Sequence, residues 1–177
     1  MNYDQMAQDT MLQLARELVS QLMDAGKKIA VAESCTGGMI SQFITTVPGS
    51  SQVFDCGICS YGNNIKQAVL GVPQQLLEEK GAVSQEVAQA MVEGVKKLAG
   101  ADYAIATTGV AGPGGGTQEK PVGLVYVAVA SPYETLVFRK QFCLSPPDTR
   151  ELIPQRAATF GMQQALDRLA VDLAQTN

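Results

Sequence analysis

Hydrophobic residues recur at helical spacing near both ends of the chain. Near the N-terminus this spacing predicts an amphipathic helix that ends at about Gly26. Its apolar positions are Met11, Leu14, Ala15, Leu18, Val19 and Leu22. A closing helix is predicted near the C-terminus, with Phe160, Ala165, Leu169 and Leu173 on one face. Pro154 has no amide hydrogen to donate, so we expect this helix to begin near Pro154 and to leave Arg150 on the turn before it.

Short apolar runs between these helices predict strands. The runs cover residues 28–32, 53–61 and 103–107, followed by a hairpin of 122–130 and 135–142 that turns at 131–133. Segments with helical spacing lie between these runs. Residues 40–47 lie between the first and second runs, and residues 63–70 and a segment after Pro73 lie between the second and third. Ser84 is placed to cap a longer helix. Its buried face is predicted to hold Val87, Met91, Val95 and Leu98.

The alternation of strands and helices predicts one α/β domain over residues 1–177, a three-layer α/β/α sandwich with a mixed sheet. The net charge is −4 and no block of lysine or arginine occurs, which argues against nucleic acid as a partner. No apolar stretch is long enough to span a membrane, and the first residues lack a signal-peptide pattern. We therefore expect a cytoplasmic protein with no membrane partner.

The chain contains no histidine. Ser-His-Asp and Cys-His catalysis and histidine-ligated metals are therefore excluded, so acid–base chemistry must use Lys, Tyr, Asp, Glu or Cys. The four cysteines are Cys35, Cys56, Cys59 and Cys143. Cys56 and Cys59 fall inside a predicted strand and the other two are far away in sequence, so small buried thiols are favoured over a zinc site. We expect no metal.

Ser34 lies where the first predicted strand turns into a helix that begins with small residues. Amide groups at the start of a helix lack partners inside the helix, and they would supply oxyanion donors beside a serine nucleophile. The alternative is that Ser34 caps this helix. Lys66 follows Tyr61 by five residues and would lie in the first turn of a helix that starts near Asn63. Burial and the helix dipole would lower its pKa, as a lysine base requires, whereas the alternative is a solvated surface lysine.

The glycine-rich segment 109–116 follows Thr107 and Thr108 at the end of a predicted strand. It fits neither the Walker motif nor the dinucleotide-binding fingerprint. It is either a phosphate-binding loop or a flexible connection to the hairpin, because loops at strand ends carry ligands in open α/β sheets. Arg150, before the last helix, could bind a phosphate bidentately or could simply face solvent.

Several blocks of the sequence resemble the C-terminal domain family of the competence/damage-inducible protein CinA. They are residues 31–38 (VAESCTGG), 48–51 (PGSS), 60–61 with Lys66, 70–72 (LGV), 81–84 (GAVS), 108–113 (TGVAGP) and 120–123 (KPVG). The resemblance extends from about the first strand to the last helix. It implies a nicotinamide mononucleotide deamidase that needs no cofactor and forms nicotinic acid mononucleotide and ammonia. It also implies a homodimer with a small-molecule nucleotide as substrate.

By position, the resemblance makes Ser34 the nucleophile, Lys66 the base and Tyr61 the hydroxyl partner of the base. The substrate-binding residues that it implies are Gly49, Ser50, Ser51, Thr108, Gly109 and Arg150. Gly62 and Asn64 depart from the family, which commonly has a serine and an acidic residue there, and Pro154 is unusual in the last helix. The alternative function is therefore a nucleotide-binding relative with little or no turnover.

Overall fold

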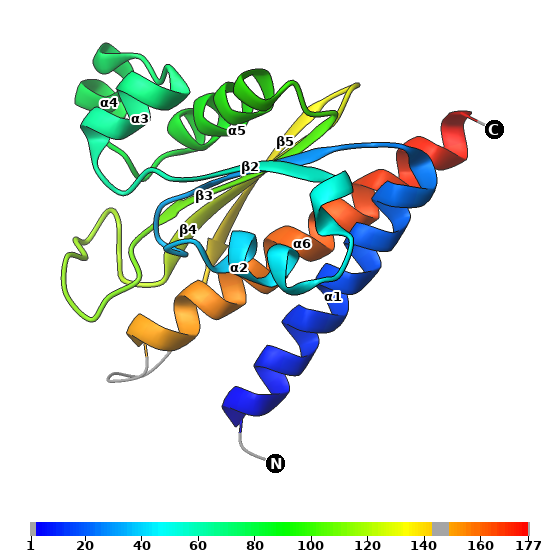
Figure 1. Cartoon of the computed structure of the whole chain (residues 1–177). Helices are drawn as coiled ribbons and strands as arrows, with labels where there is room; N and C mark the ends of the chain where they lie inside the picture. The colour runs from blue at the N-terminus through cyan, green and yellow to red at the C-terminus, as the bar shows by residue number, and fades with distance from the viewer. Residues whose placement is uncertain (1–2, 143–148, 177) are drawn as a thin grey trace.

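A mixed sheet of five strands lies between two layers of helices (Figure 1). The computed structural model describes residues 3–142 and 149–176. The strands are β1 (Ile29–Glu33), β2 (Phe54–Cys59), β3 (Tyr103–Gly109), β4 (Leu124–Ala130) and β5 (Thr135–Gln141). In the order β2-β1-β3-β4-β5, β1 is parallel to both of its neighbours and β4 is antiparallel to both of its own.

The helices cover both faces of this sheet. They are α1 (Tyr3–Ala25), α2 (Met39–Thr46), α3 (Asn63–Leu70), α4 (Gln74–Lys80), α5 (Gln85–Ala99) and α6 (Thr149–Thr176), with a short 3₁₀ turn, η1 (Ser50–Gln52). Helices α1, α2 and α6 pack on one face, and α3, α4 and α5 lie on the other. The predicted three-layer α/β/α sandwich with a mixed sheet is confirmed. No helix in residues 3–142 and 149–176 is both long enough and apolar enough to cross a membrane.

The two faces of the sheet carry side chains of different size. Successive strand residues point to opposite faces, so the sequence Ile29-Ala30-Val31-Ala32 places the large side chains with α1, α2 and α6. The face under α5 is lined by alanines, namely Ala30, Ala32, Ala104, Ala106, Ala128 and Ala130. Because alanine side chains are short, α5 packs close to the centre of the sheet, and its buried Val87, Met91 and Val95 fill that layer.

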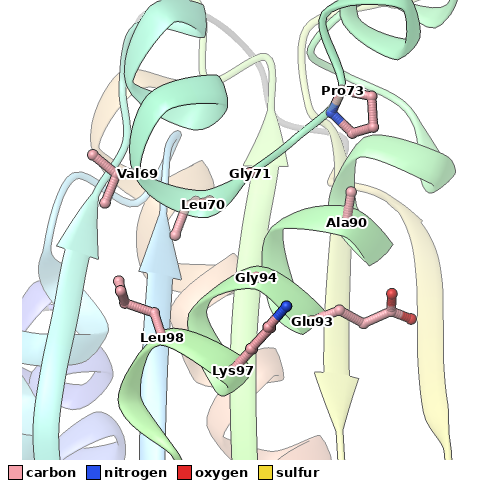
Figure 2. Close-up of a pocket in the computed structure, with 9 residues that line it drawn as sticks. All are labelled: Val69, Leu70, Gly71, Pro73, Ala90, Glu93, Gly94, Lys97 and Leu98. Atoms are coloured by element: carbon pink, nitrogen blue, oxygen red, sulfur yellow. The ribbon is translucent and has the colours of Figure 1, made fainter.

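Helix α5 also packs closely against the end of α3 (Figure 2). A Cβ atom built at Gly94 would lie 2.0 Å from the carbonyl oxygen of Leu70. The absence of a side chain at Gly94 therefore sets the spacing of the two helices. Beside this contact, Val69 and Leu98 border a groove of about 600 Å³ between α3 and α5.

Gly94→Ala is expected to destabilise the fold by about 1–3 kcal/mol, because the new methyl group overlaps backbone that cannot move independently. This loss outweighs the roughly 1 kcal/mol that alanine gains over glycine in a helix. Urea unfolding measures the change. Gly161→Ala is the matched comparison, since its nearest neighbour would be a side-chain methyl of Ile105 at 3.1 Å. Equal or greater stability of Gly94→Ala would contradict the proposed close packing.

Two predictions about the helices are wrong. Leu98 is 54% exposed rather than buried, because it lies at the last turn of α5, beyond the edge of the contact with the sheet. Helix α6 begins at Thr149, not near Pro154, so Arg150 is the second residue of the helix. Pro154 removes one amide donor early in this 28-residue helix, and the packing of α6 on the sheet and on α1 compensates for that single loss.

The carboxyl ends of β1, β2 and β3 meet at one edge of the sheet. The chain leaves β1 toward α2 on one face and leaves β2 toward α3 on the other. Diverging connections of this kind open a crevice above the strand ends, which is where ligands bind in open α/β sheets. The segments that follow these three strands are therefore the expected location of a site.

Candidate functional site

Ser34 is the first residue after β1. Its amide donates to the carbonyl of Thr107 on β3 at 3.0 Å, so the neighbouring strand fixes its backbone. The chain then turns through residues 34–38 before α2 begins at Met39. Gly38, with a φ of 97°, occupies the capping position of α2. The alternative that Ser34 caps this helix is therefore wrong, and its half-buried hydroxyl is available for another role.

Lys66 lies in the first turn of α3, which begins at Asn63 as predicted. Its side chain is 1% exposed, so the alternative of a solvated surface lysine is wrong. The lysine Nζ lies 3.1 Å from Ser34 Oγ. Two residues separated by 32 positions in the sequence thus form a hydrogen-bonded pair at the carboxyl edge of the sheet.

Two carbonyl oxygens determine how the Lys66 amine is oriented. Nζ donates to the carbonyl of Ser60 at 2.6 Å and to that of Tyr61 at 3.2 Å. A neutral amine has two hydrogens and one lone pair. When both hydrogens point to these carbonyls, the lone pair points toward the remaining neighbour, Ser34 Oγ. This is the geometry that a general base needs in order to accept the serine proton.

The surroundings of Lys66 favour this neutral form. Burial lowers the pKa of Lys66 below the ordinary lysine value, because removal from water penalises the charged ammonium more than the neutral amine. Negative charge on the nearby Cys35 or Cys59 thiols would act in the opposite direction. The predicted lowering of the Lys66 pKa is thus supported, with burial as its main cause.

The Ser34–Lys66 pair opens into a cavity of about 190 Å³. The cavity is lined by Ser34, Cys35, Tyr61, Lys66, Ala82, Val83, Thr108, Gly109, Ala111 and Arg150. Lys66 and Thr108 are buried, whereas Tyr61 and Arg150 are exposed at its open side. The small apolar side chains of Ala82, Val83 and Ala111 leave room for one flat ring of modest size.

Tyr61 and Arg150 meet at the mouth of the cavity. Arg150 Nη2 lies 3.2 Å from the Tyr61 hydroxyl, and Nη1 lies 3.4 Å from the carbonyl of Gly112. The Tyr61 hydroxyl is therefore next to Arg150, and it is the main-chain carbonyl of Tyr61 that contacts Lys66. The guanidinium is held between the glycine-rich loop and an aromatic side chain, where it could bind an anionic group at the cavity entrance.

Thr108 and Gly109 form one wall of the cavity. The Thr108 hydroxyl donates to the carbonyl of Ala82 at 2.7 Å, which holds the loop before α5 against the end of β3. A Cβ atom at Gly109 would lie 2.6 Å from the carbonyl of Leu124, so only glycine fits there. Gly109 and Ala111 line the cavity, whereas Gly114 and Gly115 have no atom within 4 Å of a built Cβ and lie in open space.

The structure does not bring Gly49, Ser50 and Ser51 to this cavity. They precede β2, at the amino edge of the sheet, whereas Ser34 follows the carboxyl end of β1 (Figure 1). A Cβ atom at Gly49 would contact the Met23 side chain near the end of α1. Helix α2 carries the chain from one edge of the sheet to the other. Within this chain these three residues are therefore far from Ser34.

The expected oxyanion donors at the start of α2 are already engaged. The amides of Gly38, Ile40 and Ser41 donate to the carboxylate of Glu33, which is fully buried. This corrects the expectation that these helix amides face the reaction centre. Glu33 itself was missed, although a signal existed: an acidic residue ends a buried apolar strand, and a buried carboxylate must find donors.

The three cysteines in the described part of the chain, Cys35, Cys56 and Cys59, do not gather at one site. Cys56 and Cys59 lie three residues apart on β2 and therefore point to opposite faces of the sheet. Burial raises the pKa of the Cys35 thiol to about 12, so it stays protonated near neutral pH although it lines the cavity. No group of three or more potential metal ligands occurs within residues 3–142 and 149–176. Cys143 lies outside these residues.

Comparisons of the sequence find one protein family and many relatives. The CinA C-terminal domain matches residues 11–169. A CinA-like protein of Desulfotalea psychrophila is 49% identical over 149 residues, which cover 84% of this chain and 35% of that protein. A CinA-like protein of Thermotoga sp. (strain RQ2) is 44% identical over 82% of this chain and 35% of its own length. The chain thus spans about a third of the length of these relatives.

Solved structures of similar proteins share the whole fold. A competence/damage-inducible protein from Agrobacterium tumefaciens superposes with a TM-score of 0.84 at 35% identity, covering 89% of this chain and 96% of that one. A competence or damage-inducible protein from Enterobacter asburiae gives a TM-score of 0.83 at 30% identity, over 90% of this chain and 98% of that one. The arrangement of strands and helices described above is therefore common to these proteins.

Proposed function

Since this chain belongs to the CinA C-terminal domain family, we propose that it is a nicotinamide mononucleotide deamidase with a Ser34–Lys66 pair at its centre. One observation carries the proposal: a buried lysine amine that is hydrogen-bonded to two carbonyl oxygens lies 3.1 Å from a serine hydroxyl inside a cavity. In a chain without histidine, this arrangement supplies a nucleophile and a base.

In the first half of the reaction, neutral Lys66 accepts the Ser34 proton and Ser34 Oγ attacks the carboxamide carbon. A tetrahedral intermediate forms with a negative charge on the former carbonyl oxygen. The C–N bond then breaks, Lys66 returns the proton to the leaving nitrogen, and ammonia departs. The carbonyl carbon remains bound to Ser34 as an ester, and Lys66 is neutral again.

In the second half, a water molecule takes the place of ammonia. Lys66 accepts a proton from this water as its oxygen attacks the ester carbon. The bond to Ser34 Oγ breaks, and Lys66 returns the proton to the serine. Nicotinic acid mononucleotide leaves as the carboxylic acid, which then ionises in water. Over the two halves, one amide bond is broken and one water is consumed for each ammonia released. No cofactor takes part in either half.

The substrate is proposed to place its ring in the cavity and its phosphate at the entrance. Ala82, Val83 and Ala111 offer an apolar lining for the pyridine ring, and Arg150 offers a fixed guanidinium for the phosphate. Arg150 as a phosphate ligand is proposed over a purely solvent-facing role because two hydrogen bonds hold its guanidinium at the mouth. The expected homodimer stays a prediction, as do Gly49, Ser50 and Ser51 as substrate ligands.

Purified protein is expected to release ammonia from nicotinamide mononucleotide and to form nicotinic acid mononucleotide in equal amount. Activity is expected to survive EDTA, because the proposed steps use only side chains. A coupled ammonia assay and chromatography of the nucleotide measure the two products. Substrate binding without ammonia release would instead support the alternative of a nucleotide-binding relative without turnover, and loss of activity together with a bound metal would overturn the Ser–Lys chemistry.

A further inference from the structure

A buried carboxylate organises the turn that carries Ser34. Glu33 is the last residue of β1 and is 0% exposed. Its Oε2 accepts from the Thr36 hydroxyl at 2.6 Å and from the amides of Gly38 and Ile40 at 3.1 Å each. Its Oε1 accepts from both the amide and the hydroxyl of Ser41, at 2.9 and 2.8 Å. Five donors from the turn and from the start of α2 thus converge on one side chain.

The contact with Thr36 continues toward the cavity. The Thr36 hydroxyl lies 2.8 Å from the Thr107 hydroxyl, and Thr107 in turn is hydrogen-bonded to the Cys35 thiol. Because Thr36 donates its hydrogen to Glu33, Thr107 must be the donor to Thr36. This buried chain ties the residues on either side of Ser34 to β3, whose Thr107 carbonyl also accepts the Ser34 amide.

The backbone of Glu33 joins this turn to the lysine. The Ser60 amide donates to the Glu33 carbonyl at 2.8 Å, and the Ser60 carbonyl accepts from Lys66 Nζ. Glu33 is therefore connected to both partners. It is joined to Ser34 by the peptide bond between them, and to Lys66 through the hydrogen bonds of Ser60. A shift of Glu33 would change the position of both partners.

We propose that Glu33 is a positioning residue that holds Ser34 Oγ against Lys66 Nζ. The proposal rests on the proposed Ser–Lys deamidase function and extends it to a residue that does not touch the substrate cavity. The side chain acts by accepting five hydrogen bonds from the turn and the start of α2, and the amides of Gly38, Ile40 and Ser41 are thereby kept from the reaction centre. Rigid support of this kind matters because small misplacements of reacting groups cost large factors in rate.

Glu33→Gln tests the role with almost no change in shape. A glutamine has one acceptor oxygen and one NH2 group, and the backbone amides can only donate. In either orientation the NH2 group therefore faces at least one amide, that of Ser41 or those of Gly38 and Ile40. We expect kcat to fall by about 100-fold while KM stays unchanged, since the cavity walls and Arg150 are untouched.

Thr36→Val is a milder second variant, which removes one hydroxyl at nearly constant volume. We expect an intermediate loss of about tenfold in kcat, again without a change in KM. If Glu33→Gln does not fold, Thr36→Val carries the test. Wild-type kcat in Glu33→Gln, or in a folded Thr36→Val when Glu33→Gln is lost, would overturn the proposal.

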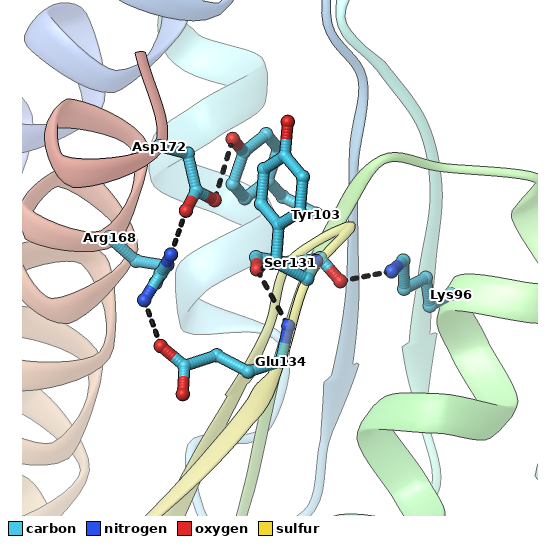
Figure 3. A network of polar contacts seen from close by, with 7 residues as sticks. Lys96, Tyr103, Ser131, Glu134, Arg168 and Asp172 are labelled. Carbon is cyan, nitrogen blue, oxygen red and sulfur yellow. Dashed lines mark hydrogen bonds and ion pairs between the residues drawn. The ribbon is translucent and has the colours of Figure 1, made fainter. Parts of the chain in front are cut away.

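Asp172→Asn is the matched control, because Asp172 is also a buried carboxylate in a polar network (Figure 3). It accepts from the Tyr103 hydroxyl at 3.0 Å and pairs with Arg168, at the opposite edge of the sheet from Ser34. We expect both Asp172→Asn and Glu33→Gln to lower the melting temperature. Only Glu33→Gln should lower kcat per folded molecule. An equal loss of kcat in both variants would show a general effect of stability and would overturn the positioning role.

A fluorophosphonate probe separates failure of this proposal from failure of the deamidase function. The probe phosphonylates an activated serine and needs no nucleotide, so the rate of Ser34 labelling reports the Ser34–Lys66 geometry directly. If the wild type is labelled but releases no ammonia, only the deamidase function fails, and slower labelling of Glu33→Gln still supports the positioning role. Equal labelling rates of the two proteins would overturn it, as would a wild-type Ser34 that does not react.

Discussion

Ser34→Ala is expected to abolish ammonia release from nicotinamide mononucleotide, with kcat lowered by about 1,000-fold or more, because the covalent nucleophile is lost. The fold should be retained. The change removes one half-buried hydroxyl and its contact with Lys66, and a hydrogen bond of this kind contributes about 1 kcal/mol to stability. Steady-state kinetics and thermal unfolding of the same preparation measure both effects.

Ser131→Ala is the matched control for this variant. Ser131 is a buried serine whose hydroxyl accepts from two amides in the β4–β5 turn, away from the cavity. It should keep full activity. Near wild-type turnover in Ser34→Ala would remove Ser34 as nucleophile. Because burial raises the pKa of Cys35 to about 12, a water activated by Lys66 would then be the better candidate.

Lys66→Arg is expected to be nearly as inactive as Lys66→Ala, although it preserves the positive charge. A guanidinium stays protonated in proteins, so it cannot accept the Ser34 proton. General-base catalysis contributes about 100- to 10,000-fold, and a loss of this size in kcat is expected for both variants. Lys96→Arg is the control, since Lys96 is another lysine with a pKa lowered by burial and donates to the Ser131 carbonyl. Substantial turnover in Lys66→Arg would show that the lysine supplies only positive charge and would remove it as the general base.

The same pair also predicts the pH profile of the wild type. Only neutral Lys66 has a lone pair for the Ser34 proton, so kcat/KM should rise with pH to a plateau. The midpoint should lie below the ordinary lysine value of 10.5, because burial lowers the pKa of Lys66. Initial rates across the pH range of stable protein measure it. A rate that falls as pH rises through this range would contradict Lys66 as a general base.

The local pattern of the chain determined most of the architecture. The alternation of large and small residues in 29–32 decides which face of β1 meets which helices. The alanines at alternate positions of β1, β3 and β4 allow α5 to pack close to the sheet. The absence of histidine by itself restricts acid–base chemistry to other side chains. Ser34 and Lys66 could be chosen as candidates because each follows a predicted strand, and parallel strands end at the same edge of a sheet.

Helix ends were determined less well by the sequence. Pro154 argued for a late start of α6, but local preference is weaker than the packing of a long helix against α1 and the sheet. Leu98 follows the apolar spacing of α5 and is nevertheless exposed, because the helix extends past the surface it covers. The start of α6 and the exposure of Leu98 both depend on packing against distant parts of the chain. The residues next to these positions in the sequence therefore could not predict either result.

Only the tertiary structure decided how the site is built. The 3.1 Å distance between Ser34 and Lys66, the two carbonyls that orient the amine and the burial that lowers its pKa all depend on strand pairing between distant segments. Glu33 is an acidic residue directly after a buried apolar run, and the sequence does not show which donors surround its carboxylate. Five donors, all within eight residues of it, make it a buried acceptor once α2 folds back over β1. Sequence specifies which groups are present, whereas desolvation and hydrogen-bond direction, which determine their reactivity, exist only after the chain has packed.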